Sequence, residues 1–200
     1  MSEASIRTQI SSKYSPDNHG LFPFKQLLKA AGVEVSYPVG DSIIEYSLGF
    51  AITVDQERSV SFPLTEIDFL ESIRHSNVQV TYNVHGANEG YLGESTAIET
   101  AYALQCNVPV VLVRPITSFS DSLDPEVRLL FERVADDLLV VPLDRLSPSQ
   151  ARIALAEAIL AGPTVYLLDE ERQMMPIVAS MLTNKYAETW WEYSRNEVSS

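Results

Sequence analysis

The sequence predicts an α/β domain in which helices cover both faces of a doubly wound, mainly parallel sheet of five or six strands. Two observations support this. Short runs rich in β-branched residues alternate with longer runs of helical periodicity, which is typical of βαβ units. The run VPVVLVRP at 108–115 is almost wholly apolar, as expected for a strand buried on both faces. The length of 200 residues suits one domain, and no segment resembles a linker, so we expect a single domain over 1–200.

The expected elements follow one another along the chain, and several of their ends carry recognisable signals. Gly32 is placed to end the first helix, Asp124 followed by proline is placed to begin a later one, and Ser147 and Gln150 have the spacing of a capping box. Strands are expected at 5–10, 33–38, 78–84, 108–115, 138–143 and 164–169, and helices at 21–31, 64–76, 96–107, 125–134 and 148–160.

Two segments fit this alternation less well. Residues 39–63 alternate between apolar and polar, which indicates an inserted hairpin-like segment with one buried face. Residues 170–196 predict a C-terminal helical extension, interrupted near Pro176, with an apolar stripe at helical spacing. That stripe, with Trp190 and Trp191, would pack on its own domain or on a second subunit.

The composition excludes several classes of partner. The chain carries 14 Lys and Arg against 27 Asp and Glu, a net charge of −13, so a nucleic acid polymer or an anionic membrane surface is not an expected partner. The acidity still permits a small phosphorylated ligand held by backbone N–H groups.

The cysteine and histidine content narrows the expectations further. The single Cys106 excludes an internal disulfide framework, and the three histidines are scattered, so we expect no metal. No apolar run has the length of a membrane span, and no signal peptide is recognisable. We therefore expect a cytoplasmic protein.

Ligands of doubly wound sheets bind beyond the carboxyl ends of the strands, which here directs attention to a glycine-bearing loop and the helix after it. Gly90 and Gly93 would let the backbone approach a ligand, and Ser95 and Thr96 add hydroxyls where the helix offers unpaired N–H groups. The segment matches neither the P-loop nor the GxGxxG dinucleotide pattern.

Glu99 has two interpretations. Thr96 and Glu99 have capping-box spacing, which would give the carboxylate a structural role. Alternatively, the carboxylate attacks the anomeric carbon of a ribosyl group or stabilises an oxocarbenium-like centre.

The sequence GYLGESTAIETAYAL, which follows a helix ending in SIRHSN, resembles the signature of the nucleoside 2-deoxyribosyltransferase-like superfamily. The resemblance covers 64–115 and extends more weakly back to the first strand. It implies a flavodoxin-like fold, Glu99 as the nucleophile that attacks the sugar C1′, a Ser95–Thr96 turn that contacts sugar or phosphate, and a homo-oligomer. A phosphoribohydrolase family with a PGGxGTxxE motif has a similar layout, but its Pro-Gly-Gly and Gly-Thr elements are absent here.

The sequence also departs from the family pattern. Gly93 stands where family members often have an aspartate, Asn77 stands where the preceding helix commonly ends in an acid, and Ser11-Ser12-Lys13-Tyr14 replaces a small-residue turn. Glu89 is a candidate substitute acid. These differences leave open a hydrolase, or a nucleotide-binding relative without turnover.

Four further residues have two interpretations each, and a fifth, Tyr91, has one. Lys13 would lie on the surface or contact a phosphate, and Asn83 would bond the ligand or tie the loop together. Tyr91 belongs to the candidate loop as a possible substrate contact. Tyr102, one turn after the glutamate, would bond its carboxylate or only pack, and Arg114 would reach the site or pair with a carboxylate.

These observations lead to one main expectation. We expect an enzyme that cleaves or transfers the N-glycosidic bond of a nucleoside or nucleoside monophosphate, with Glu99 as nucleophile and with no cofactor. The alternative is a non-catalytic nucleotide-binding or sensing module of the same fold. A weaker third hypothesis is an oligomerising protein whose C-terminal helix is the functional surface. Glu89, Glu94 and Glu99 make the site acidic, which favours these ligands over a triphosphate.

Overall fold

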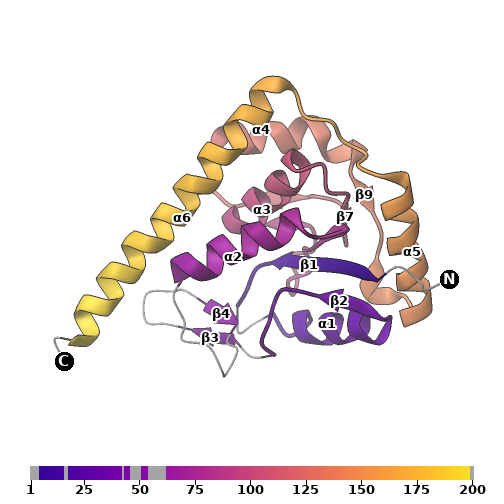
Figure 1. Ribbon diagram of the computed structural model, residues 1–200, viewed down its shortest axis with the longest axis horizontal. Coiled ribbons are helices and arrows are strands. Elements are labelled where there is room, and N and C mark those ends of the chain that lie inside the picture. The colour runs from indigo at the N-terminus through magenta and orange to yellow at the C-terminus, as the bar shows by residue number, and fades with distance from the viewer. Residues whose placement is uncertain (1–4, 16–17, 42, 46–50, 54–61, 199–200) are drawn as a thin grey trace.

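A five-stranded parallel sheet forms the centre of the computed structural model, which describes residues 5–15, 18–41, 43–45, 51–53 and 62–198 (Figure 1). Its strands run in the order β2-β1-β5-β7-β9, and each neighbouring pair is parallel. The chain adds β2 on one side of β1 and then adds β5, β7 and β9 in turn on the other side. The strand order therefore reverses once, between β1 and β5, which is the flavodoxin-like doubly wound order. This confirms the predicted fold class. The bounds are β1 Ile6–Ser12, β2 Val33–Val35, β5 Val78–Tyr82, β7 Val110–Leu112 and β9 Leu139–Val140.

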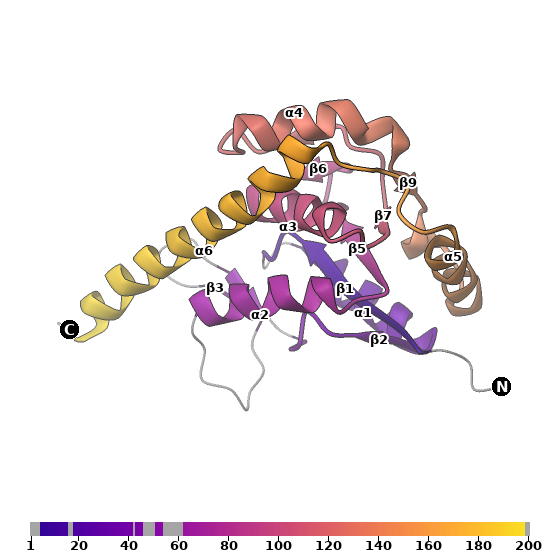
Figure 2. The ribbon, with the colours of Figure 1, turned by 45° about the horizontal axis from the view of Figure 1, so that its top comes forward.

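Helices cover both faces of the sheet (Figures 1 and 2). One face packs against α1 (Leu21–Ala30) and α5 (Pro148–Ala161). The other packs against α2 (Phe62–Arg74), α3 (Glu94–Gln105), α4 (Pro125–Val134) and the first part of α6 (Asp169–Val198). Short 3₁₀ turns, η1 (Ala135–Asp137) and η2 (Leu143–Arg145), flank β9.

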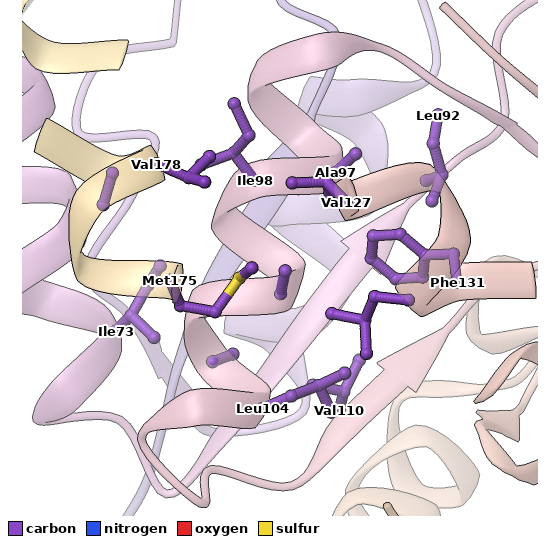
Figure 3. Close-up of a cluster of buried hydrophobic side chains, with 14 of the residues drawn as sticks. Ile73, Leu92, Ala97, Ile98, Leu104, Val110, Val127, Phe131, Met175 and Val178 are labelled. Carbon is purple, nitrogen blue, oxygen red and sulfur yellow. The ribbon is translucent and has the colours of Figure 1, made fainter. Parts of the chain in front are cut away.

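Each face of the sheet has its own core. On the α1 and α5 side the core is apolar, and β5 contributes Val78, Val80 and Tyr82 to it. On the other side, apolar residues surround α3, as Figure 3 shows for Ile98, Leu104 and residues of the neighbouring helices. Because successive strand residues point to opposite faces, the intervening residues of β5 point toward α3.

Several predicted helix ends are confirmed. The Asp124 carboxylate accepts hydrogen bonds from the backbone N–H groups that begin α4, and Ser147 and Gln150 form the capping box of α5. Gly32 follows α1 with φ +71°, a conformation that glycine adopts at little cost. The helix predicted from Thr96 instead begins at Glu94 with Gly93 as its N-cap. Thr96 is thus inside the first turn, and the predicted Thr96–Glu99 capping box is wrong.

The C-terminal third contains two further corrections. Residues 164–169 form no strand, although Val165 and Leu167 are buried and Tyr166 and Leu168 are exposed. This alternation arises because the segment crosses from α5 on one face to α6 on the other. Helix α6 is not interrupted at Pro176, because buried residues on either side of the proline hold it against α2 and α3. Its second half extends beyond the sheet (Figure 2).

The 39–63 segment contains the expected hairpin-like pairing. Strands β3 (Ile43–Glu45) and β4 (Ala51–Thr53) are antiparallel, and the rest of that prediction from 46 to 50 and from 54 to 61 lies outside the described residues. A two-residue parallel pair, β6 (Tyr91–Leu92) with β8 (Ser118–Phe119), was not predicted. No helix in the described ranges combines the length and apolar character needed to cross a bilayer.

Candidate active site

Between the sheet and α3 lies a buried layer of polar side chains. Gln9 of β1 is in register with Gln79 of β5, and Ser11 is in register with Thr81. All four are fully buried. Gln79 Nε2 donates to Ser11 Oγ over 2.5 Å, and Gln9 Nε2 donates to the same oxygen over 3.3 Å. Thr81 shares a 2.9 Å hydrogen bond with Thr100 of α3, so this layer connects the two central strands to that helix.

Glu99 lies in the second turn of α3, above this layer, with only 5% of its surface exposed. A side-chain hydrogen bond with Ser11 lowers the pKa of this carboxyl, and its Oε2 is buried with no hydrogen-bond partner among the described residues. Burial raises the pKa of Glu99 well above its ordinary value, and the nearby Glu66 charge raises it further. The Ser11 hydrogen bond acts in the opposite direction. Glu99 is therefore a desolvated carboxyl group with one oxygen that no described residue bonds.

Glu66, on α2, is a second carboxyl of the same region. Burial raises its pKa from 4.5 to about 7, and its Oε1 is buried with no partner in the described part of the chain. Tyr14 lies between the sheet and α2: its hydroxyl donates to Ile10 O over 2.9 Å and its ring packs edge-on against Phe69. Burial and the charges of both glutamates raise the pKa of this tyrosine.

The unpaired atoms of this cluster share one chemical property. Besides the two glutamate oxygens, Oε1 of Gln9 and Oε1 of Gln79 are buried without a partner among the described residues. All four atoms are hydrogen-bond acceptors. An unpaired buried acceptor costs about 1–3 kcal/mol, so natural proteins retain few of them without a functional reason. The arrangement suits a ligand that presents several hydrogen-bond donors.

The loop after β5 is held by its own contacts. Asn83 Nδ2 donates to Arg114 O over 2.9 Å, and Asn83 Oδ1 accepts from Arg114 N over 2.8 Å. Gly90 N donates to Asn83 O, and Gly90 has φ +87° with its α-carbon packed against Pro115 O. Of the two interpretations of Asn83, the geometry favours the one in which its side chain ties β5 to the end of β7.

Arg114 pairs with carboxylates rather than reaching the polar layer. It makes a bidentate ion pair with Asp144 over 2.8 Å and a 3.0 Å bond to Glu89. Glu89 also pairs with Arg145 over 3.4 Å. The carboxylate of Glu89 is thus committed to two arginines, and the suggestion that it replaces a missing catalytic acid is not supported by its position.

Four predicted ligand contacts lie at the amino end of α3. Tyr91 is half-buried on β6, Gly93 caps the helix with the Tyr91 ring beside it, Ser95 is half-buried in the first turn, and Thr96 is buried there. Thr96 O accepts from Thr100 Oγ1 over 2.6 Å. Ser95 and Thr96 lie one helical turn before Glu99 on the same helix.

Two other predicted contacts lie apart from the carboxylate. Lys13 is exposed after β1, and its carbonyl oxygen accepts a hydrogen bond from Asn18. Tyr102 interacts with Cys106 and with the charges of Arg74 and Glu71, toward the other end of α3, and burial raises its pKa. The predicted hydrogen bond between Tyr102 and the Glu99 carboxylate is not observed among the described residues.

Sequence reasoning missed the residues that surround Glu99. Gln79 alternates with the apolar Val78 and Val80 in β5, Gln9 and Ser11 flank the apolar Ile10 in β1, and Glu66 precedes the buried Phe69 by three residues on α2. A polar residue at each core-facing position of a central strand is unusual, and this pattern was the available signal.

Comparisons with known proteins add little to this geometry. No protein-family model and no curated protein matches the chain. A solved structure described as a conserved protein from Enterococcus faecalis V583 is similar at 12% identity and a TM-score of 0.34, over 89% of this chain and 99% of that one. Within the described ranges, no group of three or more His, Cys, Asp and Glu side chains could hold a metal ion.

Proposed function

We propose that this protein cleaves or transfers the N-glycosidic bond of a nucleoside or nucleoside monophosphate, with Glu99 as the nucleophile. One observation carries the proposal. A buried carboxyl, Glu99, has an oxygen with no hydrogen-bond partner among the described residues, and it lies beside the point where the strand order reverses. Ligands of doubly wound sheets bind at this switch point, beyond the carboxyl ends of the strands.

The residues support this chemistry in a specific way. Attack by the unpaired Glu99 oxygen on C1′ forms a glycosyl ester while the C1′–N bond breaks and its electron pair leaves with the base. The side-chain hydrogen bond with Ser11 lowers the pKa of Glu99 and so favours the ionised form that attacks. Water or a second base then displaces the sugar from the ester. The sequence resemblance to the nucleoside 2-deoxyribosyltransferase-like superfamily points to the same residue.

The unpaired amide oxygens favour a sugar as the group bound next to Glu99. Oε1 of Gln9 and Oε1 of Gln79 accept hydrogen bonds, and the hydroxyls of a pentose donate them. Because a site built of buried acceptors is penalised when its ligand lacks the matching donors, such oxygens would also discriminate between sugars.

A second function rests on a different property of the same group. The raised pKa of Glu99 keeps a larger share of the carboxyl protonated at neutral pH, and a protonated carboxyl is a poor nucleophile. A protonated Glu99 would donate a hydrogen bond to a ribose hydroxyl. The protein would then bind a nucleoside or nucleotide without cleaving it.

Base release separates the two functions. Wild-type protein and Glu99→Gln are incubated with nucleosides, nucleoside monophosphates and NAD, and released base is measured by chromatography. We expect release by the wild type and a loss of at least 1,000-fold in Glu99→Gln, since the nucleophile is removed. Glu126→Gln, an exposed carboxylate in the first turn of α4, is the matched control, and its rate should equal the wild-type rate. Ligand binding by both proteins without any release would establish the binding function.

A further inference from the structure

A second carboxyl belongs to the site that Glu99 defines, and it comes from a different helix. Glu66 lies on α2, three residues before the buried Phe69, and α2 packs against α3 and β1 (Figure 1). One of its oxygens is buried and has no hydrogen-bond partner among the described residues, as is also true of Glu99. An unpaired buried carboxyl oxygen on each of two adjacent helices is costly for the fold.

The surroundings of the two carboxyls are shared. Tyr14 packs on Phe69 beside Glu66, its hydroxyl is bonded to β1, and the charges of both glutamates act on it. The charge of Glu66 also acts on Glu99. Tyr37, which packs against Phe69, is the other titratable group that acts on Tyr14.

No cation offsets this negative charge within the described ranges. None of the ion pairs there includes either glutamate. Burial disfavours the ionised form of each carboxyl and the charge of Glu66 disfavours that of Glu99, so the two ionise together less readily than isolated carboxyls do.

We propose that Glu66 is the general acid–base partner of Glu99. The inference rests on the proposed function, and it names the group that gives and takes back the proton which this function requires. As the C1′–N bond breaks, its electron pair goes to the base nitrogen, which takes the proton of Glu66, while a Glu99 oxygen bonds to C1′. A water oxygen then bonds to C1′, the ester bond to Glu99 breaks, and Glu66 takes the proton that the water loses. Glu66 is thereby returned to its starting state, and the products are free base and free sugar.

The two proton transfers assigned to Glu66 account for its burial and for its unpaired oxygen. A group that gives a proton in one step and takes it back in the next works best when its affinity for protons matches the working pH. Burial on α2, without a cation or a hydrogen-bond donor at Oε1, produces this condition for Glu66.

The test compares Glu66→Gln with Asp68→Asn, an exposed position on the same helix. For Glu66→Gln we expect base release to fall by at least 100-fold and the pH dependence of kcat/KM near neutrality to flatten. Asp68→Asn should match the wild type in rate and in profile. Glu66→Asp, which keeps a carboxyl, should retain a pH-dependent limb even if its rate is lower, whereas a merely structural role of Glu66 would change the rate without changing the profile.

A second measurement separates the two chemical steps. A nucleoside whose base leaves without being protonated should restore the first step in Glu66→Gln. Intact-protein mass should then increase by one glycosyl group, because water is no longer deprotonated and the ester on Glu99 persists. This adduct should be absent from Glu99→Gln.

The outcomes distinguish the inference from the function on which it rests. If the wild type releases base and Glu66→Gln does so at the same rate with the same pH profile, the role of Glu66 is wrong and the proposed function stands. If the wild type releases no base from any substrate, both are wrong.

Discussion

Gln79 Nε2 donates a 2.5 Å hydrogen bond to Ser11 Oγ across the two central strands of the sheet. The serine oxygen also accepts from Gln9. A hydroxyl has one hydrogen and two lone pairs, so with both lone pairs used its hydrogen is available for the Glu99 carboxylate. Ser11 therefore orients the two amides and one carboxylate together.

Replacement of Ser11 by alanine should affect both stability and the site. Two buried amide groups lose their acceptor, so the free energy of unfolding should fall by about 2 kcal/mol in urea titrations. The pKa of Glu99 should rise further, because the donor that lowers it is removed. The ascending limb of base release should move to higher pH. Ser76→Ala is the control, since that hydroxyl donates to Ser72 O just after the end of α2. An unchanged pH profile in Ser11→Ala would contradict this role of the hydroxyl.

The raised pKa of Glu66 predicts how stability changes with pH. The unfolded chain loses this proton near pH 4.5, whereas the folded chain keeps it until about pH 7. The contribution of this group to stability is therefore intact below pH 4.5 and is lost as the pH rises toward 7. Glu66→Gln has no such proton. Its free energy of unfolding should exceed the wild-type value by an amount that grows from near zero at pH 4.5 to at most about 3 kcal/mol at pH 8.

Denaturant unfolding of both proteins at several pH values checks this prediction. Only the difference in unfolding free energy between the two proteins is informative. A hydrogen bond from Lys25 lowers the pKa of Asp41, and groups of this kind make both proteins more stable as the pH rises. If the difference is constant from pH 4.5 to pH 8, the folded and unfolded chains bind the Glu66 proton equally, and the prediction is wrong.

Two glycines of the loop after β5 provide a matched pair of substitutions. Both have positive φ, +87° at Gly90 and +56° at Gly86. A Cβ at Gly90 would lie 2.3 Å from Pro115 O, whereas a Cβ at Gly86 would meet nothing within 4 Å. Gly86→Ala should cost about 1 kcal/mol of unfolding free energy from backbone strain alone, and Gly90→Ala should cost at least 2 kcal/mol more. Equal losses in thermal or urea unfolding would show that the loop moves away from β7 without cost.

The fold was largely predictable because its signals are local. Cap residues such as Asp124 and Ser147 act within one turn of their helix, and the apolar run at 108–115 needs burial on both faces. The strand predicted at 164–169 was wrong because alternating burial at Val165 and Leu167 is also produced by an extended segment that crosses the edge of a core.

The candidate site was predictable only in part, since it depends on contacts between distant segments. Glu99 could be singled out from its place after a glycine-bearing loop. Its surroundings could not, because Ser11 and Gln79 become neighbours through strand register and Glu66 arrives on another helix. Glu89 stands next to the site in sequence, but Arg114 and Arg145 hold its carboxylate.

The charges around the polar layer predict that a 5′-phosphate weakens binding. The unpaired buried atoms there are acceptors, and two of them belong to carboxyls, so a phosphate finds repulsion and no donor among them. The buried cations Arg114 and Lys25 are committed elsewhere. Arg114 pairs with Asp144 and Glu89, and Lys25 bonds Asp41 and two carbonyl oxygens. Glu99→Gln, which retains the shape of the site, should bind a nucleoside at least ten times more tightly than the same nucleoside 5′-monophosphate in calorimetric titrations. If the monophosphate instead binds more tightly than the nucleoside, the prediction is wrong. Loss of that preference in Lys13→Ala would show that the exposed Lys13 binds the phosphate.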